Sequence, residues 1–82
     1  MYFVYVLKSL KDGNFYIGRT KNFERRFKEH NSGKVQSTKS RIPFILLEKI
    51  EVSSEEESIK LELNYKEGYK REEIKRKYGG VA

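Results

Sequence analysis

Five residues of this sequence have side chains whose types and expected positions could cut a phosphodiester bond. An arginine can hold a phosphate through its planar guanidinium and offset transition-state charge. A histidine or a tyrosine can position or deprotonate an attacking water. One carboxylate, with phosphate oxygens and waters, can hold Mg²⁺, which keeps part of its hydration shell in such sites. The candidates are Tyr5, Tyr16, Arg26, His30 and Glu62.

Arg26 and the only histidine are expected on one face of a helix. Asn22 is a good N-cap, and the residues at i, i+3, i+4 and i+7 of the helix after it are Phe23, Arg26, Phe27 and His30. An amphipathic helix would carry apolar residues along that whole stripe. Taken alone, either polar residue is more often structural, because an arginine can keep its head in water and a core histidine is usually hydrogen-bonded. The nearby tyrosines favour a functional interpretation.

Two strands are expected to carry those tyrosines. Residues 2–8 are aromatic and β-branched on both faces, which predicts a central strand covered on both sides. Residues 11–14 have turn chemistry, so residues 15–17 should return as the second strand of a hairpin, ending at Gly18. Tyr16 should then lie opposite Tyr5 or one step away, with the register left open.

The middle of the chain is expected to form a loop and a third strand. Gly33 can take a left-handed conformation and end the first helix. Residues 34–41 form a polar basic segment, either a solvated connection or part of a binding surface. Pro43 should open a strand over 44–52, with 44–47 as continuous core.

Glu62 is the one carboxylate predicted to point inward. Ser54 begins a helix with capping-box spacing, and Ile59 and Leu63 form the apolar pair expected to face the core. Glu62 should point with them, where a carboxylate is costly unless it meets a cation. It therefore either forms a structural ion pair, with Arg26 as one candidate, or binds a metal. A last short helix over 69–78 should carry a solvated charged face, followed by a frayed tail over 79–82.

Composition limits the class of protein. An 82-residue chain has room for one domain, residues 1–82, with a thin core. It has no cysteine, no apolar run long enough to span a membrane and no signal-peptide pattern, so a cytoplasmic location is expected. No feature indicates an obligate protein partner.

A net charge of +6, with the basic residues concentrated before position 42, favours a nucleic-acid partner. The residues expected to edge the binding cleft are basic side chains of the first helix region and the following loop: Arg19, Lys21, Arg25, Lys34, Lys39 and Arg41. Charge does not distinguish DNA from RNA, or binding from chemistry.

The sequence resembles the GIY-YIG nuclease domain, specifically its small stand-alone bacterial branch. The first signature tripeptide stands as Phe3-Val4-Tyr5, which keeps the tyrosine but not the glycine, and the second is intact as Tyr16-Ile17-Gly18. The block 16–30 matches the family pattern YIG-x-T-x-N-x-x-x-R-x-x-x-H. Glu62, in SIKLELNY, falls where the family keeps its metal-binding glutamate.

The resemblance implies an α+β fold, a three-stranded antiparallel sheet flanked by helices. It also implies a single divalent metal, Mg²⁺ or Mn²⁺, on Glu62, with Arg26 at the scissile phosphate. Tyr5, Tyr16 and His30 would lie around the nucleophile. The asparagine that some members supply near the C-terminus has no equivalent here, and the DNA-recognition domain of larger members is missing, which implies weak sequence specificity.

Two functions from different classes follow. The first is a metal-dependent endonuclease, a phosphodiester hydrolase acting on DNA, with branched or single-stranded forms as candidate substrates. The second is a non-catalytic basic module that binds structured RNA or DNA and retains only the fold. Cleavage that depends on Glu62 would distinguish them.

Overall fold

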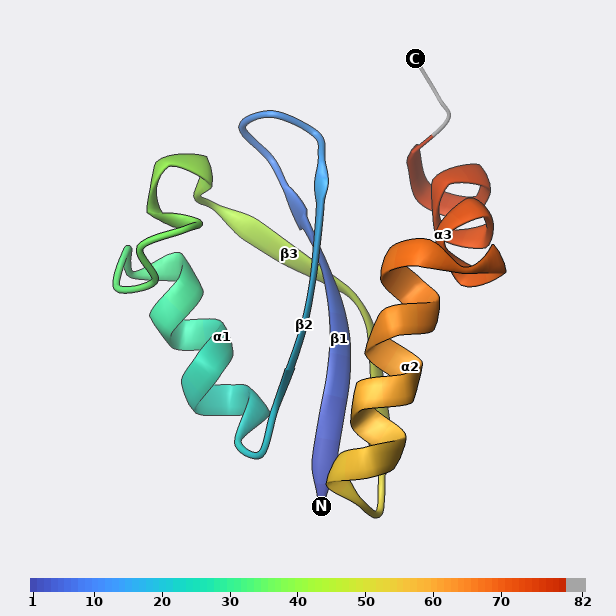
Figure 1. Cartoon of the computed structure of the whole chain (residues 1–82). Helices are drawn as coiled ribbons and strands as arrows, with labels where there is room; N and C mark the ends of the chain where they lie inside the picture. The colour runs from blue at the N-terminus through green and yellow to red at the C-terminus, as the bar shows by residue number, and fades with distance from the viewer. Residues whose placement is uncertain (80–82) are drawn as a thin grey trace.

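A computed structural model describes residues 1–79 and shows one sheet with helices on both faces (Figure 1). The sheet is antiparallel, with strand order β2-β1-β3, and confirms the expected α+β fold. Its strands are β1 (Tyr2–Ser9), β2 (Phe15–Thr20) and β3 (Phe44–Val52). The helices are α1 (Phe23–Asn31), α2 (Glu55–Glu67) and α3 (Tyr69–Ile74), with short helical turns η1 (Lys39–Arg41) and η2 (Lys75–Gly79).

Strand β1 is central and buried on both sides, as its apolar faces predict. Val4 and Val6 pack on one side in a core cluster that also contains Tyr65 of α2 and Ile74 of α3. On the other side, Tyr5 and its neighbours pack with α1 through Phe23. Helix α1 and the α2–α3 pair therefore cover opposite faces of the sheet, as Figure 1 shows.

The second strand is longer than expected. It continues through Gly18 to Thr20, so the prediction that it ends at Gly18 is wrong. Tyr5 pairs with Gly18, and Leu7 pairs with Tyr16. Tyr16 is thus two positions from Tyr5's partner rather than at most one. Because residues two apart point to the same side of a strand, both tyrosines still lie on the α1 face.

Helix α1 begins and ends with specific contacts. The Asn22 side chain accepts a hydrogen bond from the backbone N–H of Arg25 at 3.1 Å, which confirms the predicted N-cap. At the other end, the Asn31 amide accepts from the backbone N–H of Phe44 at 2.6 Å and donates to the Phe44 carbonyl at 3.1 Å. Gly33 has φ +80°, the left-handed conformation expected after this helix. These contacts fix α1 against the start of β3.

The expectation of continuous core over 44–47 is wrong. Phe44 is buried, but Ile45 and Leu46 are 40% and 39% exposed. Strand β3 is an edge strand, and its register against β1 shifts by one residue between Val6 and Leu7. Such a bulge changes the direction of the strand and of its side chains.

The inward face of α2 also differs from the expected one. Ile59 and Leu63 are 39% and 50% exposed, so that apolar pair does not enter the core. The inward stripe has the same helical spacing but consists of Ser58, Leu61, Glu62 and Tyr65. Ser58 can be buried because its hydroxyl donates to the Glu55 carbonyl at 2.6 Å. The predicted Ser54 cap is present, accepting from the Glu57 N–H at 3.1 Å.

Helix α3 and η2 return the chain to the start of the hairpin. Ile74 is buried, as expected, and the Lys8 ammonium donates to the Tyr78 carbonyl at 3.2 Å. The Tyr65 and Tyr78 hydroxyls donate to Glu48 at 3.0 and 3.1 Å. Of the expected tail, residues 80–82 lie outside the described part of the chain. None of the helices in residues 1–79 has the length and apolar character needed to cross a bilayer.

Candidate active site

A buried chain of hydrogen bonds links β1, helix α1 and the 34–41 segment. The Tyr5 hydroxyl lies 3.0 Å from His30 Nε2, and His30 Nδ1 lies 2.9 Å from Thr38 Oγ1. All three side chains are buried. In either neutral tautomer the ring donates through one nitrogen and accepts through the other. Thr38 and Val35 are both buried, so the 34–41 segment is not simply a solvated connection.

Tyr16 completes an aromatic group around His30. The Tyr16 and His30 ring centroids are 4.9 Å apart at 61°, and those of Tyr5 and Tyr16 are 6.4 Å apart. Phe23 meets Tyr5 edge-on at 5.6 Å, and edge-to-face pairs of this kind are favourable. Three of the five residues expected in the site therefore lie together.

The Tyr5 hydroxyl lies directly over Gly18. A Cβ atom at position 18 would be 2.6 Å from that oxygen. The glycine is thus needed for space, since its φ is not positive. Strand β2 is an edge of the sheet. The hydroxyl consequently lies over the edge strand, in a buried position.

Burial sets the protonation states of Tyr5 and His30. Loss of hydration raises the pKa of Tyr5 to about 12, with contributions in the same direction from Tyr16 and Glu62, and Arg26 partly offsets this. Burial, and after it the positive charge of Arg26, lowers the pKa of His30 to about 4. At neutral pH the site therefore contains an uncharged phenol and an uncharged imidazole.

Arg26 is close enough to influence both pKa values but is not buried. Its side chain is 38% exposed, and its guanidinium pairs with Glu29 one turn along α1 at 3.1 Å. The ion pair with Glu62, considered as a structural alternative, is not formed. Arg26 is thus a partly exposed cation at the edge of the aromatic group.

Glu62 approaches the same edge of the sheet from the opposite face. Its oxygens lie 3.4 Å from Arg19 Nε and 3.4 Å from Lys66 Nζ. Arg19 is the cross-strand partner of Val4 and therefore points toward α2. The Glu62 side chain is 19% exposed, so its carboxylate is accessible at the rim while its charge is compensated by two cations.

The protein donors for a metal are few. Within residues 1–79 no three carboxylate, histidine or cysteine side chains come together as a ligand cluster. A lone carboxylate fits Mg²⁺ or Mn²⁺ only when phosphate oxygens and waters complete the coordination. Glu62 fits that kind of site, because both of its cation contacts are long for charge-assisted hydrogen bonds and can be exchanged.

The six basic residues expected to edge the cleft are in different situations. Arg25 pairs with Glu29 at 3.8 Å, and Lys21 lies over the Tyr2 ring. Lys34 and Lys39 are exposed on the loop. Arg41 is held at 2.8 Å by Asp12 and also donates to the Phe15 carbonyl, so it fastens the hairpin turn. Arg19 is the one that contacts Glu62.

Two contributors to the site were missed from the sequence. Thr38 lies in a polar loop and has no signal that distinguishes it from a solvated threonine. Lys66 carries a recognisable signal, because it follows Glu62 at i+4 on the same helix.

Sequence comparison identifies the family to which this combination of fold and aromatic group belongs. A model of the GIY-YIG catalytic domain matches residues 1–78. The chain therefore belongs to the GIY-YIG family.

The relatives of the chain are small bacterial proteins. It is 35% identical over 75 residues to the UPF0213 protein SH2523 of Staphylococcus haemolyticus, covering 90% of each chain. It is 39% identical over 66 residues to the UPF0213 protein BH0048 of Halalkalibacterium halodurans, covering 79% of this chain and 69% of that one. The solution NMR structure of the UPF0213 protein BH0048 from Bacillus halodurans matches with a TM-score of 0.55 at 35% identity, covering 98% of this chain and 89% of that one.

Proposed function

We propose that this protein is a divalent-metal-dependent endonuclease that hydrolyses phosphodiester bonds in DNA. The observation that supports this most directly is the meeting of two sets of groups at the rim of β2. Tyr5, Tyr16, His30 and Arg26 come from the α1 side, and Glu62 comes from the α2 side. Family membership favours nuclease chemistry at that position.

Tyr5 and His30 would orient the attacking water. With pKa values of about 12 and about 4, neither is charged at neutral pH. The Tyr5 oxygen can accept a hydrogen bond from water while its own bond to His30 Nε2 fixes its direction. These pKa values suit Tyr5 and His30 to position a water molecule more than to accept a proton from it.

Arg26 would hold the phosphate. Its contact with Glu29 is a partly exposed pair, which contributes only about 0–1 kcal/mol. A phosphate can therefore replace Glu29 as the partner of the guanidinium at little cost in free energy. It would receive two parallel hydrogen bonds from Arg26. The positive charge then lies where negative charge develops in the transition state.

Glu62 would hold Mg²⁺ or Mn²⁺. When bound, such an ion stabilises the departing oxygen and the charge on the phosphate. The residue's own role is to supply one carboxylate at the rim. Weak metal binding is expected in the absence of substrate, because both Glu62 oxygens already face cations.

The substrate would be recognised mainly through its backbone. Exposed cations such as Lys34 and Lys39 can contact phosphates, and phosphate contacts do not read sequence. Low sequence specificity follows, with branched or single-stranded DNA as candidate substrates.

A second candidate is a nucleic-acid-binding module without catalysis, for structured RNA or DNA. The observation that favours it is the charge compensation of Glu62, which needs no metal. Binding by either kind of protein should weaken steeply with salt, because each basic contact releases counterions.

The deciding experiment is a cleavage assay with the purified protein. Supercoiled plasmid and branched or single-stranded DNA are incubated with Mg²⁺ or Mn²⁺, for the wild type, Glu62→Ala and Arg26→Ala. Glu56→Ala, an exposed glutamate on the same helix, is the matched control. Nicking by the wild type and by Glu56→Ala only is the expected result. Nicking that persists in Glu62→Ala would refute this assignment of the site, and tight binding with no cleavage in any metal would favour the binding module.

A further inference from the structure

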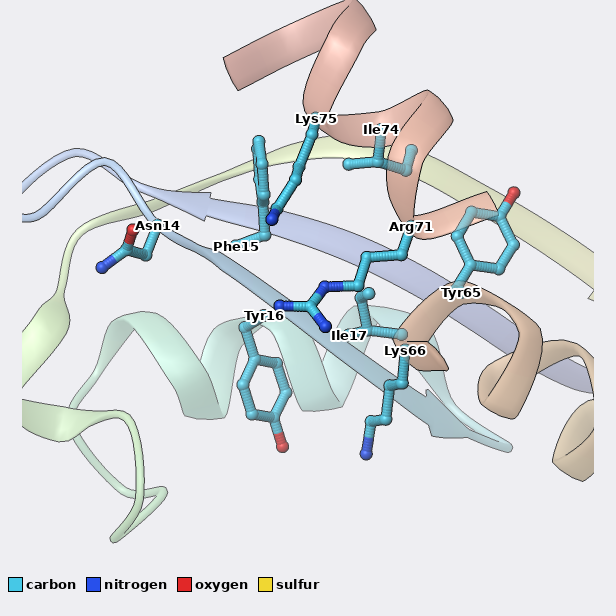
Figure 2. A pocket seen from close by; sticks show the side chains of 9 residues that line it. All are labelled: Asn14, Phe15, Tyr16, Ile17, Tyr65, Lys66, Arg71, Ile74 and Lys75. Carbon is cyan, nitrogen blue, oxygen red and sulfur yellow. The ribbon is translucent and has the colours of Figure 1, made fainter. Parts of the chain in front are cut away.

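A cavity of about 530 Å³ lies beside the proposed catalytic groups, between β2 and the α2–α3 side of the molecule (Figure 2). Its walls combine three aromatic and three basic side chains: Phe15, Tyr16, Tyr65, Lys66, Arg71 and Lys75. Tyr16 belongs to both the cavity and the aromatic group around His30. The cavity therefore continues the candidate site along the edge strand.

The charge of the cavity is positive and largely uncompensated. Its lining includes no carboxylate. Among residues 1–79, neither Arg71 nor Lys75 has an acidic partner within 4.0 Å, and Lys66 pairs with Glu62 at 3.4 Å. Arg71 and Lys75 are at i and i+4, a spacing at which like charges repel. An anion in the cavity would relieve that repulsion.

The orientation of the side chains suits a phosphate beside a base. Figure 2 shows the Arg71 guanidinium and the Lys75 ammonium extending from α3 and η2 toward β2. Phe15 points from that strand toward Lys75 and is half-buried, so part of its ring is available for contact, whereas the Tyr16 ring points to the α1 face. Aromatic rings at the edge of a cationic groove are the usual platform for unpaired bases.

We propose that this cavity binds one nucleotide, with its phosphate on Arg71, Lys75 and Lys66 and its base against Phe15. Its volume is in the range typical of small-ligand sites. In a nucleic-acid substrate, this nucleotide is the one next to the phosphate that is cut, an assignment that rests on the proposed function. A strand would then run along β2, with contacts on α3 and η2 in addition to those proposed for Lys34 and Lys39.

The test is a binding experiment on the full chain in EDTA, so that cleavage plays no part. The probes are deoxythymidine 5′-monophosphate, inorganic phosphate and a ten-nucleotide oligo(dT). Backbone amide shifts are followed by NMR, and oligonucleotide affinity is measured at several salt concentrations. The test variant is Arg71→Gln/Lys75→Gln. The control is Lys60→Gln/Arg76→Gln, which removes the same charge from exposed positions outside the cavity lining.

Amide shifts should concentrate at residues 14–17 and 71–75. The test variant should bind the oligonucleotide at least about tenfold more weakly, as the loss of charged hydrogen bonds predicts. Its salt slope should fall by about 1.4, since each single-strand contact contributes about 0.7. Shifts with the monophosphate would show that a free nucleotide suffices, and shifts with the oligonucleotide only would show that the strand is required. Equal shifts with inorganic phosphate alone would overturn the role assigned to the base.

Failure of this proposal is distinct from failure of the proposed function. If the wild type cleaves DNA and the test variant binds like the control, the cavity assignment is wrong and the nuclease assignment stands. If the test variant loses binding while the wild type cleaves nothing, the cavity assignment stands and the nuclease assignment fails.

Discussion

Tyr5 and Gly18 are cross-strand partners, and the phenol of Tyr5 occupies the space that a side chain at position 18 would need. A Cβ there would lie 2.6 Å from the Tyr5 oxygen and 2.7 Å from the carbon that carries it. Tyr5 is fixed in that position by burial and by its hydrogen bond to His30. The glycine of the family motif thus makes room for its tyrosine.

Gly18→Ala should destabilise the protein by about 1–3 kcal/mol, because Tyr5 has nowhere to move in a packed core. Urea unfolding measures the change. In the double variant with Tyr5→Ala, the two effects should be clearly less than additive, since the clash is gone. Full additivity would show that the two residues do not compete for space.

The free energy of unfolding should decrease as the pH is lowered, over a pH range set by the pKa of His30. Burial lowers its pKa from 6.5 to about 4, so the folded state favours the neutral ring. The stabilisation is complete above pH 6.5 and is lost as the pH falls from there to about 4, by about 3 kcal/mol in total. Urea unfolding at pH 7, 5.5 and 4.5 measures it. His30→Gln, which removes the only histidine, should flatten the curve above pH 5; an unchanged slope in that variant would contradict the assignment.

Thr38→Val should cost about 1–3 kcal/mol, because the new side chain has nearly the same shape but leaves His30 Nδ1 without its partner at a fully buried position. Thr38→Ser keeps the hydroxyl and is the matched control. Thermal unfolding of the two variants should separate them clearly. Equal losses would mean that packing, and not the hydrogen bond, fixes the loop.

Arg26→Ala and Glu62→Ala should each change stability by less than about 1 kcal/mol, since the two do not pair and their own partners are exposed or half-exposed. Cleavage should be lost in both. Calorimetry and the plasmid assay give the two readouts. Variants that melt far below the wild type, with the double variant no worse than either, would indicate a coupled structural role instead.

Lys34→Gln/Lys39→Gln should weaken DNA binding to a similar extent for unrelated sequences, because these exposed lysines can contact only the backbone. Arg41 is left intact in this variant, since its pairing with Asp12 fastens the hairpin turn. Fluorescence anisotropy with two unrelated oligonucleotides measures the effect. A loss confined to one sequence would show that the loop reads bases.

The elements of this fold that could be predicted from sequence are those that rest on local chemistry. The Asn22 and Ser54 caps, the left-handed Gly33 and the doubly apolar β1 each follow from the residues themselves. The inward face of α2 could not, because it depends on a serine small enough to lie against the sheet and a tyrosine whose hydroxyl finds Glu48. Ile59 and Leu63 are apolar and have the right spacing, but they lie outside the core.

The site shows the same division. The helix stripe with Arg26 and His30 is visible as a departure from amphipathic spacing. The partner of His30 is not, because it lies eight residues away in an irregular loop. The tyrosine register depends on how the hairpin closes, and both the turn geometry and the packing of the two sheet faces set it.

The contact between Lys66 and Glu62 has a consequence for the order in which a complex would assemble. Lys66 faces the proposed nucleotide cavity and also neutralises the proposed metal ligand. Under both proposals, an arriving phosphate competes for this lysine and leaves one Glu62 oxygen free for the metal. The DNA strand would therefore bind first and the metal ion second. A metal ion alone would then not complete the site until DNA is present.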